Sequence, residues 1–297
     1  MTTISVMGAT GRTGGSIAQR LLARDVHVRA LARSDERLRP IAAQGAEALA
    51  GDAAHAAYLT RAFRGADAVY ALMPHDPAEP GYLRQQQRQG EAMADALRAS
   101  GVRRVVMLSS IGADQPAGTG VVQSLYEQEQ RLRAIDGLNV LFLRPGAFFD
   151  TYHAALPVIR SAGILADALA PDQAGPLVAT RDIAAVAAEV LLAHDWQGIV
   201  VRELCGPRDM TSREVARILR ARLGLPDLQY VQVPYDEMTQ TLVEAGMAPD
   251  AAALIVEMAR GMNEGRIRST QLRDERTTLP TSFEEFSHEL AEAFGRD

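Results

Sequence analysis

The sequence contains no lysine, and all 31 of its basic residues are arginine. This absence excludes every mechanism that needs a lysine side chain. Cysteine is almost as scarce, since Cys205 is the only one, and a single cysteine excludes both an internal disulfide and a metal site built from cysteines. The six histidines are scattered along the chain, so we expect no metal site.

Two further absences limit the partners of the chain. A net charge of −6 at pH 7 argues against direct electrostatic binding to nucleic acid. No apolar run approaches the ~20 residues that a membrane-spanning helix needs, and the first residues have the pattern of a strand rather than of a signal peptide. We therefore expect a cytoplasmic protein without membrane contact, and we leave a homodimer or a protein partner open.

The chain instead has a regular alternation of apolar runs and helical patterns. We expect strands at residues 4–7, 26–32, 46–50, 66–72, 103–108, 138–143 and 198–204. This alternation predicts an α/β fold, a Rossmann-type doubly wound parallel sheet. We expect residues 1–152 to form a dinucleotide-binding domain to which residues 176–205 return. Residues 153–175 and 206–297 are expected to form a smaller, mainly helical substrate or lid region, in which 163–175 is a crossing loop and 230–234 a short strand.

The segment that organises this pattern is the first turn, Gly8-Ala9-Thr10-Gly11-Arg12-Thr13-Gly14, between the first strand and the first helix. Gly8 suits the tight turn, Gly11 allows the backbone to approach a pyrophosphate, and Gly14 lets the helix lie close to the sheet. The free amides at the helix N-terminus then face the phosphates. The alternative is a glycine-rich turn of an ordinary α/β domain. We predict a dinucleotide site.

Arg33 and Ser34 follow the second strand, where an acidic residue would bind the ribose 2′-hydroxyl of NAD. An arginine there suits the 2′-phosphate of NADP, so NADP is the predicted cofactor and NAD stays possible. Arg33 could instead be a solvated residue at the start of the next helix. Asp52, past the third strand, could accept a hydrogen bond from an adenine or could cap the following helix.

The loops after the fourth and fifth strands supply further candidates, because carboxyl ends of parallel strands line the ligand crevice. Met73 and His75 follow the fourth strand, where His75 is either near a nicotinamide or solvated. Ser109 and Ser110 follow the fifth strand, where a serine is either beside the reacting group or caps the loop backbone. The candidate cofactor-binding residues are Gly8, Thr10, Gly11, Arg12, Thr13, Gly14, Arg33, Ser34, Asp52, Met73, Ser109 and Pro145.

These motifs, together with Leu141-Phe142-Leu143-Arg144-Pro145-Gly146 and the segment Glu203-Leu204-Cys205-Gly206-Pro207, occur in a familiar order and spacing. The sequence resembles the NmrA-like branch of the atypical short-chain dehydrogenase/reductases over most of its length. The resemblance implies NADP or NAD binding. It implies either an NADPH-dependent quinone or azo-dye reductase or a redox sensor that binds the cofactor without turning it over.

The sequence departs from the family pattern at the positions that carry the catalytic residues. Typical short-chain dehydrogenases have Tyr-x-x-x-Lys in the helix at 119–135, and many NmrA-like members keep a Lys or His four residues before a Glu. Aligned on Glu129, that position is Leu125. Tyr126 lies about 100° further around the helix, so it is a weak catalytic candidate, as is Ser110. Glu129 interrupts an apolar stripe and needs donors, such as Arg144, if it is buried.

Aromatic residues make up only 5% of the chain, yet three of them fall within residues 148–152. In the family that this sequence resembles, this loop passes over the nicotinamide. Phe148, Phe149 and Tyr152, with His75, are therefore the candidate pocket for a flat apolar ligand, unless the rings belong to the core of the second region. The sequence predicts direct hydride transfer to a small-molecule acceptor such as a quinone or azo compound, with a non-catalytic NADP sensor as the alternative.

Overall fold

A computed structural model describes residues 2–296 of the chain. Its centre is a seven-stranded sheet in the order β10-β6-β5-β4-β1-β2-β3, in which every neighbouring pair is parallel. The strands are β1 (Thr3–Met7), β2 (His27–Ala32), β3 (Glu47–Ala50), β4 (Ala68–Ala71), β5 (Arg104–Leu108), β6 (Asn139–Pro145) and β10 (Ile199–Leu204). The predicted doubly wound α/β fold is confirmed.

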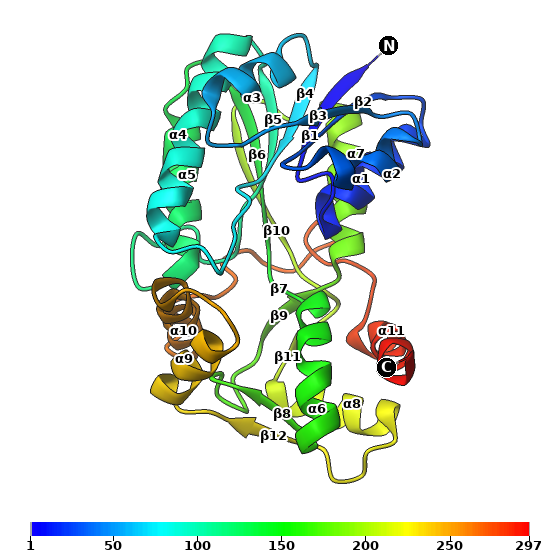
Figure 1. Ribbon diagram of the computed structural model, residues 1–297, viewed down its shortest axis with the longest axis vertical. Helices are drawn as coiled ribbons and strands as arrows, with labels where there is room; N and C mark the ends of the chain where they lie inside the picture. The colour runs from blue at the N-terminus through cyan, green and yellow to red at the C-terminus, as the bar shows by residue number, and fades with distance from the viewer. Residues whose placement is uncertain (1, 297) are drawn as a thin grey trace.

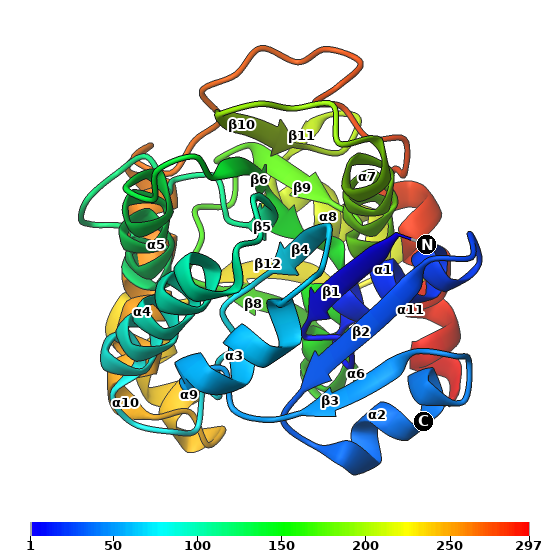
Figure 2. The same cartoon turned by 90° about the horizontal axis from the view of Figure 1, so that it is seen from above.

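Helices cover both faces of this sheet, which explains why its central strand β4 is buried at every position rather than alternating. Figure 2 shows α3 (Ala56–Phe63), α4 (Tyr82–Ser100) and α5 (Gln123–Arg133) on one face. The other face carries α1 (Arg12–Leu22), α2 (Asp35–Ala42) and α7 (Thr180–Ala193). The two faces have separate apolar clusters, with Ile17 and Ile183 in one and Leu59 and Met93 in the other.

The strand order reverses between β1 and β4, because the chain runs from β1 outward to β3 and then crosses back to the other side of β1. In a doubly wound sheet the crevice at such a reversal is where ligands bind. The segments that follow β1, β2, β4 and β5 therefore converge on one edge, as the sequence predicted.

A second group of elements lies beyond this carboxyl edge of the sheet (Figure 1). Around a third apolar cluster pack η2 (Phe149–Ala155), α6 (Leu156–Ala162), α8 (Ser212–Leu223) and α11 (Phe283–Arg296). Of two further helices, α9 (Tyr235–Glu244) packs against α10 (Pro249–Asn263), and α10 in turn packs against η1 (Gly120–Val122). The proposed division into two domains follows this arrangement but stays a prediction.

One local expectation was wrong. The segment 163–175, predicted to be a loop, contains β8 (Ile164–Asp167), which pairs in parallel with β12 (Gln229–Gln232). Its pairing partner lies 65 residues away in the sequence, from Ile164 to Gln229, so no local pattern marks the strand. A small three-stranded sheet also joins β7 (Ala147–Phe148), β9 (Gly175–Val178) and β11 (Asp209–Met210) beneath the carboxyl edge.

Within residues 2–296, no helix is both long enough and apolar enough to cross a membrane. The same residues contain no group of three or more histidine, cysteine or carboxylate side chains placed to hold a metal ion.

Candidate active site

A cavity of about 830 Å³ runs along the carboxyl edge of the sheet. Its walls come from the segments that follow β1, β2, β4, β5 and β6, and from α10 and the loop after it. One continuous space therefore joins the glycine-rich turn after β1 to the aromatic loop after β6.

Two positions of the glycine-rich turn require glycine. Gly8 has a φ of +64°, and a Cβ placed on Gly14 would lie 2.4 Å from the Gly8 carbonyl oxygen. The amide of Gly11 donates to that same oxygen at 2.8 Å and begins α1 without any side-chain cap. The uncapped N-terminus of this 11-residue helix, with no acidic residue in its first turn, suits a pyrophosphate. The turn therefore fits a dinucleotide.

The residues of the turn divide between wall and support. Gly8, Thr10, Gly11 and Thr13 line the cavity. Arg12 does not line it; its Nη1 donates instead to the carbonyl oxygen of Asp150 at 2.9 Å. Arg12 as a direct cofactor ligand is thus not supported, because its guanidinium joins α1 to the aromatic loop.

Beyond β2, Arg33 and Ser34 both line the cavity. The Arg33 side chain is 59% exposed, and among residues 2–296 its only ion pair is a loose one with Asp76, 3.8 Å between Nη1 and Oδ2. The Ser34 hydroxyl accepts a hydrogen bond from the Arg37 amide and so caps α2. Arg37 also lines the cavity, which the sequence reading missed although it lies only one helical turn beyond Arg33. Two guanidinium groups therefore border this end of the cavity.

Asp52 does not line the cavity, although Gly51 and Ala53 on either side of it do. Its Oδ1 accepts from the Ala54 amide at 2.8 Å, and its Oδ2 lies 3.6 Å from Nδ1 of His55. The carboxylate therefore stabilises its own turn, which agrees with the alternative interpretation, and Asp52 as an adenine ligand stays a prediction.

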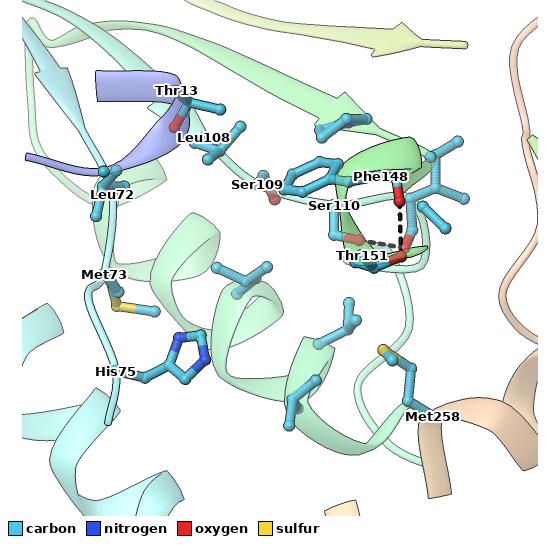
Figure 3. A pocket seen from close by; sticks show the side chains of 18 of the residues that line it. Thr13, Leu72, Met73, His75, Leu108, Ser109, Ser110, Phe148, Thr151 and Met258 are labelled. Atoms are coloured by element: carbon cyan, nitrogen blue, oxygen red, sulfur yellow. Dashed lines mark hydrogen bonds between the residues drawn. The ribbon is translucent and has the colours of Figure 1, made fainter. Parts of the chain in front are cut away.

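Met73 and His75, after β4, project into the cavity from the wall opposite Phe148 (Figure 3). The His75 ring packs edge-on against Tyr82, with ring centroids 5.7 Å apart. Burial lowers the pKa of His75 more than the neighbouring Asp76 carboxylate raises it. The imidazole is therefore neutral at pH 7 and contributes no charge to this wall.

A buried polar network lies directly behind Ser109. Glu129 accepts from Arg144 at 2.8 Å (Nε) and 2.7 Å (Nη2), and from the Ser109 hydroxyl at 2.7 Å. A bidentate guanidinium thus supplies the donors that a buried carboxylate needs, as the sequence reading anticipated for Arg144. A serine hydroxyl has one proton, so Ser109 offers the cavity only acceptor lone pairs.

The structure offers no strong proton donor at the position where typical short-chain dehydrogenases have the tyrosine of Tyr-x-x-x-Lys. Leu125 lines the cavity, whereas Tyr126 is half-buried and does not. Tyr126 is therefore corrected as a catalytic candidate, because one residue on a helix turns its side chain away from the cavity. Ser110 lines the cavity, but its hydroxyl donates to the Ile111 carbonyl at 2.9 Å. Tyr82 and Tyr152 also line it, and burial raises the pKa of both phenols.

The aromatic loop contributes two of the three rings that were expected. Phe148 and Tyr152 line the cavity next to Pro145, but Phe149 is 1% exposed and packs 5.2 Å from Phe283 in the third apolar cluster. Phe149 as a pocket wall is therefore corrected. The chain enters η2 at this residue, and the tight helical turn sends consecutive side chains in different directions.

Sequence reading missed a whole wall of the cavity. Met258 and Met262 of α10 face it, followed by Ile267, Arg268 and Ser269 of the next loop. These residues lie more than a hundred positions beyond the aromatic loop, so only the fold brings them to the site.

The sequence and the fold can be compared with those of known proteins. Residues 1–287 match the sequence model of the NmrA-like family. The chain is 34% identical over 98% of its length, and 99% of the other protein, to a (4-alkanoyl-5-oxo-2,5-dihydrofuran-3-yl)methyl phosphate reductase of Streptomyces griseus. It is 28% identical over 86% of its length to an NAD(P)H azoreductase of Xenophilus azovorans, covering 85% of that protein.

A solved structure supports the same fold. It is an NADPH-dependent quinone oxidoreductase of Escherichia coli in complex with NADPH, which superposes with a TM-score of 0.81 at 24% identity and covers 97% of this chain and 99% of the other.

Proposed function

The chain belongs to the NmrA-like family, and from this premise we propose that it is an NADPH-dependent reductase of flat, conjugated acceptors such as quinones and azo compounds. The observation that carries the proposal is the single cavity that joins the glycine turn and the Arg33 end to an apolar compartment beside Phe148. A cofactor held at one end would place its nicotinamide next to whatever occupies the other.

The residues that would hold the cofactor follow from the walls of the cavity. The uncapped amides of α1, with Thr10 and Thr13, would bind the pyrophosphate. Arg33 and Arg37 would bind the 2′-phosphate that distinguishes NADP from NAD. Ser109, whose hydroxyl proton is committed to Glu129, would accept a hydrogen bond from an amide group at the far end.

The chemistry needs little from the protein besides position. Bound NADPH would supply a hydride, and solvent would supply a proton. A quinone that takes up both becomes a hydroquinone, and NADP⁺ is released. Such acceptors stabilise the incoming electron pair themselves, so the absence of Lys and the misplaced Tyr126 are tolerated. Bringing the two reactants together in an apolar compartment is then the main source of rate enhancement.

The named substrates of the relatives share this character. A quinone, an azo bond and the 5-oxo-2,5-dihydrofuran bearing an alkanoyl group are all electron-poor conjugated systems. This common feature supports an acceptor of the same class, without selecting one of the three.

A cofactor-sensing regulator is the second candidate, and one contact favours it. Arg12 joins the cofactor turn to Asp150, whose carboxylate accepts from the amide of Thr180 at 3.1 Å and from its hydroxyl at 2.7 Å. Cofactor occupancy could thereby be transmitted to α7. The open apolar compartment beside Phe148 has no use in a sensor, and it favours the reductase.

The test is to follow the nicotinamide absorbance of NADPH with purified protein and a panel of quinones and azo dyes, and to titrate NADPH and NADH binding to the same samples. We expect oxidation well above the rate without protein. Tight NADPH binding without oxidation would instead favour the sensor.

A further inference from the structure

The loop that follows α10 lines the cavity and is held at both ends. We call residues 266–271 the strap. At its start, the amides of Arg266 and Ile267 both donate to the Gly261 carbonyl, at 2.8 and 3.1 Å. The Ile267 side chain packs on Gly112, where an added Cβ would lie 3.0 Å from it. The strap thus begins against the loop that carries Ser109 and Ser110.

The other end of the strap is held by Glu203 of β10, a carboxylate that is only 1% exposed. It accepts from the hydroxyl of Ser269, from the amide and hydroxyl of Thr270 at 3.0 and 2.8 Å, and from the Gln271 amide at 3.2 Å. These four donors satisfy the carboxylate completely. Between the two anchors stands Arg268, whose backbone is therefore fixed in place.

Arg268 is an exposed residue that lines the cavity, and it has no hydrogen bond or ion pair with any residue from 2 to 296. Its neighbour Arg266 pairs with Glu264 at 2.8 Å, and Arg273 pairs with Asp209. Glu203 is committed to the strap itself, and Asp209, which also lines the cavity, is committed to Arg273. Arg268 is thus a cation at the cavity wall that no carboxylate among residues 2–296 pairs with.

Arg268 lies at the opposite end of the cavity from Arg33 and Arg37. Those two follow β2, whereas the strap lies against the β5 loop and β10. β2 and β5 are three strand spacings apart in the sheet, or about 14 Å. A dinucleotide with its 2′-phosphate at Arg33 extends toward β5, so the guanidinium of Arg268 is left for the acceptor rather than for the cofactor.

We propose that Arg268 binds an anionic substituent of the acceptor, a carboxylate or a phosphate, while the flat part of that acceptor lies against Phe148 and the two methionines of α10. This proposal rests on the proposed function, because it assigns the substrate class of the same site. A guanidinium recognises both anions through paired N–H donors, and methionine side chains adapt to the irregular body of a ligand.

The test uses two azo dyes that differ by one charge, 4-dimethylaminoazobenzene and its 4′-carboxylate. For each enzyme the ratio of kcat/KM for the carboxylate dye to that for the neutral dye is measured at fixed ionic strength. In Arg268→Gln we expect this ratio to fall by about tenfold or more relative to wild type, the loss typical of a charge-assisted hydrogen bond. The matched control is Arg266→Gln, also on the strap but paired with Glu264, which keeps the wild-type ratio.

A second measurement separates the subsite from the chemistry. The two dyes are titrated into protein loaded with NADP⁺, and inorganic phosphate is added as a competitor at the same ionic strength. We expect the carboxylate dye to bind in preference to the neutral one in wild type, phosphate to displace it, and Arg268→Gln to lose both effects.

The outcomes are distinct. An Arg268-dependent preference in binding, with neither dye reduced, supports the subsite and contradicts the reductase. Reduction of both dyes at a ratio that Arg268→Gln leaves unchanged supports the reductase and overturns the subsite. Benzoate is tested beside phosphate as a carboxylate competitor. Displacement of the carboxylate dye by only one of the two identifies the substituent that the subsite binds, whereas equal displacement shows that the subsite accepts either anion.

Discussion

At the scale of single residues, the cavity wall is organised by which charges already have partners. Glu129 is saturated by Arg144, Arg133 and Ser109, so its charge contributes to the fold and not to a ligand. Arg33 has only a loose contact with Asp76, at 3.8 Å between exposed groups, which contributes little to stability. Arg33 therefore remains available to a phosphate.

The availability of Arg33 predicts cofactor preference. In Arg33→Ala the affinity for NADPH should fall about tenfold relative to that for NADH, since a charge-assisted contact to the 2′-phosphate is lost. Titration of both nucleotides measures the ratio. Arg39→Ala is the control, because Arg39 lies on α2, which begins two residues after Arg33, but does not line the cavity. An unchanged ratio of NADPH to NADH affinity in Arg33→Ala would show that this arginine does not bind the 2′-phosphate.

The saturation of Glu129 predicts a large cost for breaking its pair. Arg144→Met removes two hydrogen bonds from the buried Glu129 carboxylate and leaves it the Ser109 hydroxyl and the Arg133 guanidinium at 3.1 Å, which should lower the free energy of unfolding by about 2–4 kcal/mol. Urea denaturation measures the loss. Arg144→Met with Glu129→Leu in the same chain should recover part of it, since no buried charge is then left without a partner. A loss under about 1 kcal/mol in the single variant would contradict the account.

At the scale of elements, helix ends are where the sequence is most explicit. Thr211 and Glu214 have the spacing of a capping box, and α8 begins there, with the Glu214 amide donating to the Thr211 hydroxyl at 3.1 Å and the Thr211 amide donating to Glu214 at 3.0 Å. Gly101 ends α4 in the left-handed conformation, as the sequence also indicated.

The capping box gives a prediction on stability. Thr211→Ala should lower the free energy of unfolding by about 1 kcal/mol, because the Glu214 amide loses its acceptor at the N-terminus of α8. Thr241→Ala serves for comparison: its hydroxyl donates to the Glu237 carbonyl within the exposed α9, where the substitution should cost less than about 0.5 kcal/mol. Equal losses in the two variants, measured by chemical denaturation, would show that the cap contributes nothing special.

How much of the structure the sequence predicts depends on how local each signal is. The parallel strands, the glycine turn and the capping box come from patterns within a few residues, and these were predicted. β8 was missed because it depends on β12, and Phe149 was misplaced because the direction of its ring depends on η2. The wall formed by Met258, Met262 and Arg268 has no local signal at all, because it becomes part of the site only when α10 packs beyond the sheet.

At the scale of the whole molecule, the site lies where the sheet meets the elements beyond its carboxyl edge. Contacts that cross this boundary include Arg12 with Asp150 and Glu203 with the strap. Cys205, at the end of β10, lies on the same boundary: its amide donates to the Thr277 carbonyl at 2.8 Å, and its own carbonyl accepts from the Leu279 amide at 2.7 Å.

This single cysteine can report on opening of the molecule. Its residue is 2% exposed, and burial raises the pKa of its thiol to about 11. Because the raised pKa favours the protonated form, thiolate is scarce at pH 8, and we expect reaction with an aromatic disulfide reagent to be slow in the folded protein and fast in urea. Saturating NADPH should slow it further. Labelling of the folded protein as fast as of the unfolded one would contradict the burial.

The central claim is that one cavity holds the cofactor and the acceptor together. The most direct test is a single turnover, in which protein carrying one equivalent of bound NADPH, freed of excess cofactor, is mixed with a quinone and the nicotinamide absorbance is followed. The account predicts that each bound NADPH is consumed as one hydroquinone forms. Bound NADPH that persists as in a sample without quinone would contradict it, and would make the protein a sensor of its cofactor.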